Sequence, residues 1–229
     1  MIDAVLLEFD GVIAETRVAR RRALLETLAE DGVQLSDAEF DERCAAMPVR
    51  ASVRAAFSQR DRAMDEALLE LAAVRAERRF SEIVSTGVSL VDGAADFIAS
   101  AHARTRLGIV SYAARPEIDA VLGLARLEDA FELIIANDDA YQPKPSRAAY
   151  IGALERLSRR RTVAPKYVVA LESGVAGIRA AKSAGIRCAA VGSLPVHQAV
   201  DADALIPSLV GQTIGSLDAL TTDAQAAGR

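Results

Sequence analysis

Six short apolar runs, spread along the 229-residue chain, constrain its fold more than any other feature. Each has four to six residues, is rich in Val, Ile and Leu, and is too short for a buried helix. Strands that are covered on both faces have this composition, so we expect a parallel sheet. The runs lie at residues 4–9, 106–111, 132–136, 167–171, 187–191 and 203–207.

Helical stretches separate the later runs. Residues 116–131, 146–160 and 174–185 carry apolar residues at helical spacing, and the last of them ends in Gly185, a natural helix stop. Strands that alternate with helices form a doubly wound α/β layer, in which a parallel sheet is covered by helices on both faces. We therefore predict an α/β fold built on a doubly wound parallel sheet.

A long interval without strand-like runs follows the first strand. Residues 16–80 are rich in Ala, Leu, Glu and Arg, which predicts an all-helical insertion of about four helices. An insertion at this point lies over the carboxyl end of the first strand, where open α/β sheets bind ligands. We expect a core domain of residues 1–15 and 81–229 and an α-helical cap domain of residues 16–80.

The charge and composition of the chain argue against a nucleic-acid or membrane partner. The net charge is -5 and 51% of residues are hydrophobic, which fits a globular protein and gives no electrostatic footprint for nucleic acid. No apolar run approaches the length of a membrane span, and no leader-like segment precedes the first strand. The two cysteines lie far apart, which favours free thiols. We expect a cytoplasmic protein without a nucleic-acid or membrane partner.

The stretch LLEFDGVIAET at residues 6–16 presents two acids where the first strand ends. Glu8 and Asp10 are two residues apart, so a strand places both side chains on the same side. Gly11 follows them and lets the backbone turn closely around a bound group. The arrangement suits an anion together with a metal ion.

Three further landmarks follow in order, each at a strand end: Ser111, Lys144 in QPKPSRAAY, and Glu172 in ALESGVAGIRAAKSAG. With Glu8-Phe9-Asp10-Gly11-Val12, they make nearly the whole chain resemble the haloacid dehalogenase (HAD) superfamily. The similarity is to its helical-cap phosphatases and β-phosphoglucomutase-like members. This resemblance implies a HAD-like Rossmannoid core with an inserted α-helical cap.

The resemblance also implies phosphoryl transfer to and from a small phosphorylated metabolite, assisted by Mg²⁺. By this resemblance, Glu8 occupies the position of the nucleophile and Asp10 the position of the acid/base. Ser111 and Lys144 occupy the positions of the hydroxyl and the lysine that contact the phosphoryl oxygens. The implied metal ligands are Glu8, Asp10 and Glu172. Gly11, Arg50 and Tyr112 are the expected substrate contacts, and Arg50 is placed where a guanidinium can hold a distal phosphate in a fork.

Two departures from the family pattern affect turnover. The family's nucleophile is an aspartate, and Glu8 is longer by one methylene, about 1.5 Å. A misplacement of about 1 Å can cost on the order of 10²-fold in rate. The family's acidic pair at the fourth landmark is here Glu172-Ser173, so one carboxylate that a hard cation prefers is missing. We expect weakened activity and weak Mg²⁺ binding.

Two functions therefore remain open from the sequence. The first is an Mg²⁺-dependent phosphatase, or a phosphomutase, weakened by Glu8. The second is a catalytically inactive HAD-like protein that binds a phospho-ligand or regulates a protein partner. In both, Lys144 is expected to be needed for phosphate binding and, as a pocket lysine, to contribute little to the core.

Overall fold

A computed structural model gives the structure of the protein and describes residues 1–44, 47–60, 65–87, 89–139 and 141–227. In this part of the chain one parallel sheet of six strands has the order β3-β2-β1-β4-β5-β6. The strands coincide with the six apolar runs, so the predicted doubly wound sheet is confirmed. They are β1 (Ala4–Leu7), β2 (Arg106–Val110), β3 (Leu133–Ile135), β4 (Val168–Glu172), β5 (Arg187–Val191) and β6 (Ala204–Ile206).

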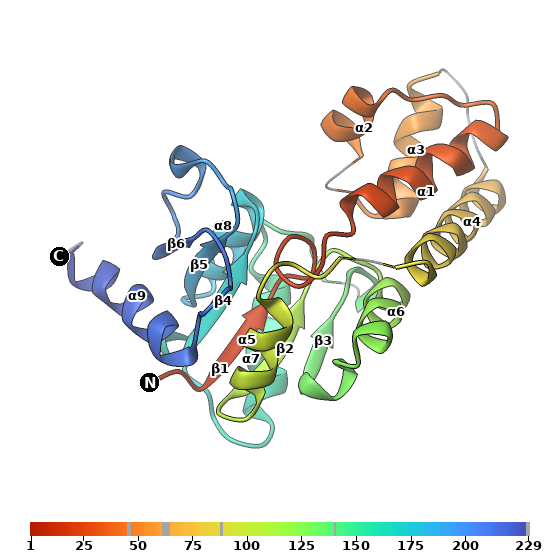
Figure 1. The fold of residues 1–229 in the computed structure, drawn as a ribbon. Coiled ribbons are helices and arrows are strands. Elements are labelled where there is room, and N and C mark those ends of the chain that lie inside the picture. The colour runs from red at the N-terminus through yellow and green to blue at the C-terminus, as the bar shows by residue number, and fades with distance from the viewer. Residues whose placement is uncertain (45–46, 61–64, 88, 140, 228–229) are drawn as a thin grey trace.

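Helices cover both faces of the sheet (Figure 1). Val5 and Leu7 of β1 pack in one buried cluster with residues of α5 (Ala94–His102), α6 (Arg115–Ala125) and α9 (Ile214–Ala227). Ala4 and Leu6 point the other way, into a second cluster with residues of α7 (Ala148–Ser158) and α8 (Val175–Ser183). Successive strand residues face opposite sides, so β1 is covered twice, which explains its continuous apolar sequence. No helix in the described residues is long and apolar enough to cross a membrane.

The segment between β1 and α5 is helical, as the sequence predicted. Its described helices are α1 (Arg17–Glu30), α2 (Asp37–Arg43), α3 (Val49–Ser58) and α4 (Glu66–Ser85). They share an apolar cluster of their own, which includes Leu28, Phe40 and Leu69. Figure 1 shows this group set beside the carboxyl edge of the sheet, with α4 next to α6. The helical segment therefore has a core separate from that of the sheet.

The helix α4 continues past residue 80, where the sequence analysis had ended the cap. Phe80 and Val84, in its last two turns, are buried in the cluster of the sheet and not in the helical cluster. One helix therefore packs against both clusters, and no break in the chain marks the predicted boundary.

The last described residues of the chain are helical. The sequence TTDAQAA at residues 221–227 continues α9. Thr221 is buried, and its hydroxyl donates to the carbonyl of Leu217. Arg187, from β5, pairs with Asp218 at 2.9 Å. These tertiary contacts stabilise a helix whose composition alone does not predict it.

A close approach between α5 and the segment before α9 requires a glycine. Gly93 caps α5 with a φ of 82°, and a Cβ there would lie 2.3 Å from the backbone nitrogen of Val210. We expect Gly93→Ala to lower the free energy of unfolding by at least about 2 kcal/mol, because the left-handed backbone and the clash both disfavour a side chain.

Urea unfolding checks this, with Gly123→Ala as the matched control. Gly123 lies in α6, and outside the neighbouring residues and backbone of that helix no described atom lies within 4 Å of an added Cβ. The control should leave stability unchanged or raise it by about 0.5–1 kcal/mol. Equal effects of the two substitutions would contradict this account.

Candidate active site

The ammonium of Lys144 lies at the centre of the site. It donates to Glu8 Oε2, to Glu172 Oε1 at 2.6 Å and to the carbonyl oxygen of Val110 at 2.9 Å. The lysine side chain is only 3% exposed. An ammonium has three donors, so each is already used. The two carboxylates raise the pKa of Lys144 despite its burial, and the group stays charged.

Both carboxylate oxygens of Glu8 are held by hydrogen bonds. Oε1 accepts from the hydroxyl of Ser111 and from the backbone N–H of Phe9 at 2.8 Å, and Oε2 accepts from Lys144. Glu8 continues β1, and its own N–H donates to the carbonyl of Leu171 in β4. The carboxylate is therefore oriented from the strands on either side of β1.

Glu172, at the end of β4, is buried beneath the lysine. Its Oε1 accepts from Lys144 and from the hydroxyl of Tyr150 on α7. Burial raises the pKa of Glu172 to about 7, and Lys144 only partly opposes that rise. A Cβ at Gly177 would lie 1.9 Å from Glu172 Oε2, so the glycine in α8 makes room for the carboxylate.

Asp10 is bound from the helical segment. Its Oδ1 accepts from the hydroxyl of Thr16, and its Oδ2 pairs with Arg20 of α1 at 2.6 Å. The same guanidinium pairs with Glu117 of α6 at 2.9 Å. Burial raises the pKa of Asp10 to about 6, since desolvation, Glu8 and Glu117 together outweigh Arg20. The pKa of Asp10 thus lies closer to neutral pH than that of an exposed aspartate.

A cavity of about 410 Å³ opens onto these groups, and we call it the inner cavity. The helical segment contributes Arg17, Arg20 and Met47 to its wall, and the start of α8 contributes residues 174–177. Its lining residues are Glu8, Asp10, Arg17, Arg20, Met47, Tyr112, Lys144, Glu172, Ser173, Gly174, Val175, Ala176 and Gly177.

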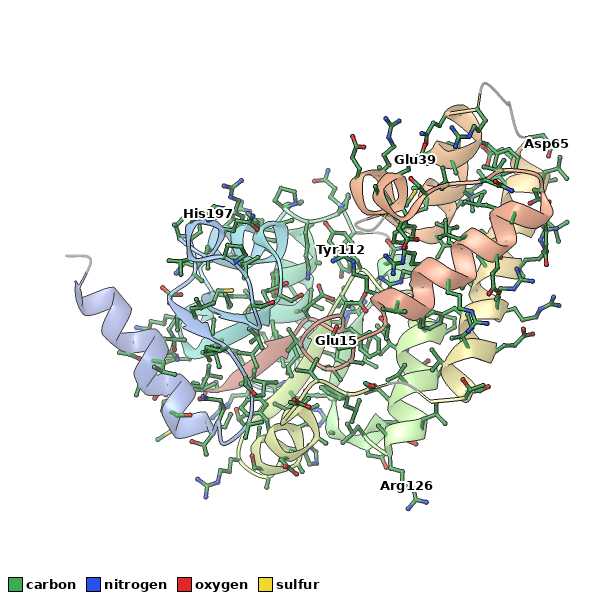
Figure 2. The ribbon with its side chains drawn as sticks, turned by 45° about the horizontal axis from the view of Figure 1, so that its top comes forward. Glu15, Glu39, Asp65, Tyr112, Arg126 and His197 are labelled. Carbon is green, nitrogen blue, oxygen red and sulfur yellow. The ribbon has the colours of Figure 1, made fainter. Side chains whose placement is uncertain are left out.

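The structure brings together most residues that the sequence singled out. Glu8, Asp10, Lys144 and Glu172 line the inner cavity, and Ser111 reaches the site through its bond to Glu8. Tyr112 also lines it, at the junction of the sheet and the helical segment (Figure 2).

The phenol group of Tyr112 donates to the carbonyl of Lys144. Burial raises the pKa of this phenol to about 12, so Tyr112 remains a donor.

Gly11 and Arg50 lie elsewhere. Gly11 has a φ of 74° and lines an adjoining cavity with Ser173, whose Cβ would be 2.9 Å from a Cβ at position 11. Among the described residues, Arg50 is not part of the inner cavity wall. It pairs with Glu66 and Glu70 of α4 and borders a neighbouring cavity. The position of Arg50 in the sequence did not predict these two acidic neighbours, because they belong to a different helix.

Several residues at the site were not among those that the sequence predicted. Among them are Tyr150, Arg20 and Glu117, which contact Glu172, Asp10 and Arg20 respectively. A signal existed for Tyr150, since a tyrosine on an apolar helix face needs a partner for its hydroxyl. Arg20 and Glu117 are 97 residues apart, and no local pattern pairs them.

The family model described as haloacid dehalogenase-like hydrolase matches residues 5–191. The chain belongs to this family. Protein CbbY of Cereibacter sphaeroides is 34% identical over 195 residues, which are 82% of this chain and 83% of that protein.

Solved structures of CbbY from Rhodobacter sphaeroides align closely with the HAD-like fold described above. One, in complex with phosphate, has a TM-score of 0.83 and 31% identity, over 95% of this chain and 100% of that one. Another, of a CbbY variant in complex with xylulose-(1,5)bisphosphate, has a TM-score of 0.83 and 30% identity, over 95% and 99%. The predicted family and fold are confirmed.

The groups that the family resemblance assigns to Mg²⁺ do not fit a metal site in this arrangement. The hydroxyl of Ser173 donates to the carbonyl oxygen of Asp10 at 2.7 Å, and the carboxylates of Glu8 and Glu172 are bonded to Lys144. Among the described residues no three His, Cys, Asp or Glu side chains are grouped so that they could hold an ion. Glu8, Asp10 and Glu172 line the same cavity, but with Glu8 and Glu172 bonded to Lys144 they do not form such a group.

Removal of the Lys144 charge is expected to destabilise the fold, contrary to the small contribution expected from the sequence. Lys144→Met should cost about 3–5 kcal/mol at pH 8, because the carboxylates of Glu8 and Glu172 would be left buried without a cation. Without Lys144, the folded-state pKa of Glu172 rises further above 7, while its unfolded value stays near 4.5.

A group with a raised folded pKa loses stability as pH rises, so the cost of Lys144→Met should be smaller at pH 5 than at pH 8. Urea unfolding at both pH values checks this, with Lys166→Met as the control. Lys166 lies against the ring of Tyr167 and outside the cavity wall. An equal cost at the two pH values would contradict the buried carboxylate account.

Restoring an acid at position 173 is expected to create Mg²⁺ affinity. Ser173→Asp replaces the hydroxyl that bonds to the Asp10 carbonyl with a carboxylate beside it, and hard cations prefer such oxygens. Calorimetric titration of MgCl₂ without phosphate should detect binding at least about tenfold tighter than in the unsubstituted protein. Ser173→Asn, which adds an uncharged oxygen, is the control. Tight Mg²⁺ binding by the unsubstituted protein would refute the conclusion that its carboxylates fit a metal site poorly.

Proposed function

We propose that this HAD-like protein binds a small phosphorylated metabolite in the inner cavity and transfers its phosphoryl group slowly. Residues 16–80 act as the cap over the site, and residues 1–15 with 81–229 as the core. In this proposal Glu8 stands in the nucleophile's position and Asp10 in that of the acid/base. Ser111 and Lys144 stabilise the negative charge of Glu8 by hydrogen bonds.

The observation that carries the proposal is the saturation of Glu8. Attack on phosphorus needs a carboxylate oxygen that is free and aligned with the leaving group. Here Ser111, Phe9 N–H and Lys144 engage both oxygens, and Lys144 has no donor left for a phosphoryl oxygen. Each turnover must break contacts between buried charges, which supports slow transfer.

The binding of a phosphate group has independent support. The first turn of α8 borders the inner cavity, and within the described residues no side chain caps that turn. Its unbonded N–H groups and the helix dipole favour an anion. Arg17, Arg20 and Lys144 add positive charge to the wall. The relative CbbY has been crystallised with phosphate and with xylulose-(1,5)bisphosphate.

Asp10 supplies the proton step in this proposal. Its raised pKa of about 6 leaves part of the population protonated near neutral pH, so it can donate to a leaving oxygen. Arg20 and Thr16 fix its two oxygens. Because both partners come from the start of the helical segment, the position of the cap controls the acid.

A catalytically inactive phospho-ligand-binding or regulatory protein is the second candidate. The bond between Ser173 and the Asp10 carbonyl favours it, because a neutral hydroxyl occupies the position where the family resemblance implies a charged metal ligand. In that case the ligand-loaded cap would present a surface to a protein partner. The two candidates share the pocket and differ in turnover.

Release of inorganic phosphate from a panel of sugar phosphates and phosphoglycolate, with and without MgCl₂, distinguishes the candidates. The unsubstituted protein should release phosphate slowly. Glu8→Asp should raise the rate by about 10²-fold, since its shorter side chain moves the carboxylate back by about one bond length and frees it from one of its partners. Addition of Ser173→Asp should raise the rate again in the presence of Mg²⁺.

Controls separate chemistry from binding. Glu8→Gln keeps the length of the side chain but removes the nucleophilic carboxylate, so it should bind inorganic phosphate and release none. If the original protein released no phosphate and only the variant with both Glu8→Asp and Ser173→Asp did, the proposal of slow phosphoryl transfer would be wrong. The catalytically inactive candidate would then be favoured. Failure of the original protein to bind inorganic phosphate by calorimetry would exclude both.

A further inference from the structure

The guanidinium of Arg20 bridges the helical segment and the core. Arg20 lies on α1, and its side chain is 14% exposed. Its Nη1 pairs with Asp10 Oδ2 at 2.6 Å, and its Nη2 donates to Glu117 Oε2 at 2.9 Å. Asp10 follows β1, whereas Glu117 lies in the first turn of α6. Two acids from different elements of the core therefore hold the two ends of one guanidinium.

The pair with Arg20 explains why Glu117 is buried. Only 2% of this residue is exposed, and glutamates are rarely buried so fully unless they are paired. Its Oε2 also accepts from the backbone N–H of Ala114, at the longer distance of 3.3 Å. Such a capping contact needs no buried charge, whereas a buried carboxylate without a cation is strongly unfavourable. Arg20 is thus the partner that compensates the burial of Glu117.

The second acid restricts how Arg20 can contact the first. A guanidinium is planar and rigid, but it stands on a long side chain with several rotamers. A bond to Asp10 alone would leave the plane free to turn about that bond. With Nη2 bonded to Glu117, any such turn breaks a buried ion pair. Glu117 therefore fixes the direction from which Arg20 meets Asp10.

Helix α6 is a firm base for this contact. Ile118 and Val121, which follow Glu117 in that helix, are buried in the cluster of the sheet. Phe80 and Val84 of α4 belong to the same cluster, and α4 packs against α6 (Figure 1). The helical segment thus rests on the helix that begins with Glu117.

We propose that Glu117 is a positioning residue for the proton step. It holds Arg20, and Arg20 in turn fixes the carboxyl group of Asp10 at the inner cavity. Glu117 is not among the described residues of the inner cavity wall, so it acts through Arg20 and not on the ligand. This inference rests on the proposed function, since it takes Asp10 as the acid.

Phosphate release from the sugar phosphate of the panel that reacts fastest tests the role. Glu117→Ala frees one end of the guanidinium, and a misplacement of about 1 Å can cost on the order of 10²-fold in rate. We expect kcat to fall by about 10- to 10²-fold. The affinity for inorganic phosphate, measured by calorimetry, should stay within about twofold, because Lys144 and the first turn of α8 are unchanged. A fall in affinity as large as the fall in kcat would overturn the proposal.

The conservative variant Glu117→Gln should retain most of the rate. Its amide oxygen has the same reach and still accepts from Arg20, so kcat should stay within about threefold of the original value. A loss as large as that of Glu117→Ala would show that the charge of Glu117 matters and the position of Arg20 does not.

A double-mutant cycle tests whether Glu117 acts through Arg20. When Arg20→Met is already present, Glu117→Ala should change kcat by no more than about twofold, because the group that Glu117 holds is gone. An undiminished loss in that background would overturn the positioning role and leave Glu117 as a helix cap. Arg20→Gln takes the place of Arg20→Met if the latter does not fold.

Amide hydrogen exchange gives a readout that does not depend on turnover. In the first turn of α1 the N–H of Arg20 donates to the carbonyl of Thr16 at 2.9 Å. Glu117→Ala should speed exchange over residues 17–24 by about tenfold, since a hydrogen bond between charged groups contributes about that factor to local stability. Unchanged exchange would overturn the inference, and so would equally faster exchange in β2 and β4, which would indicate a general loss of stability.

Asp119→Asn is the control for these measurements. Asp119 lies on the same helix as Glu117, but its side chain is 52% exposed and pairs with Arg115. This substitution should change neither kcat nor the exchange of α1. An unchanged kcat in Glu117→Ala, with phosphate release by the original protein, would refute the positioning role alone. Failure of the original protein to bind inorganic phosphate would instead refute the proposed function.

Discussion

The site depends on one buried ammonium, that of Lys144, placed between two carboxylates at the carboxyl ends of neighbouring strands. Glu8 follows β1 and Glu172 ends β4, and the two strands are paired in parallel register. Neither acid is exposed enough for water to stabilise its charge. A buried charge without a partner costs several kcal/mol, so lysine and acids must be present together. The ion pairs that stabilise this edge of the sheet also occupy the Lys144 ammonium and the Glu8 carboxylate, the two groups expected to act on a phosphoryl group.

The length of the Glu8 side chain decides which groups its carboxylate contacts. A longer carboxylate reaches Lys144, Ser111 and its own neighbouring N–H at once, so its two oxygens are satisfied without a ligand. Ser173 complements this by bonding to the Asp10 carbonyl. The two departures from the family pattern thus act in the same direction, because each replaces an open position of the site with an internal hydrogen bond.

Arg20 joins the helical segment to this chemistry. It contacts Asp10 just after β1 and Glu117 at the start of α6, and it borders the inner cavity. Its two acidic partners outweigh burial and raise its pKa, so it stays charged. Because Asp10 and Glu117 share this one guanidinium, a displacement of Arg20 would change the contacts of both acids at once.

The sequence by itself determined the six strands, the helical insertion and the order of Glu8, Ser111, Lys144 and Glu172, because these follow from local periodicity and from strand ends that meet at one edge of a parallel sheet. It did not determine which charges are satisfied. The pairs of Arg50 with Glu66 and of Arg20 with Glu117 each join two different helices. Only tertiary packing decides such contacts, since burial and distance set the strength of a charge interaction and neither is written in a local pattern.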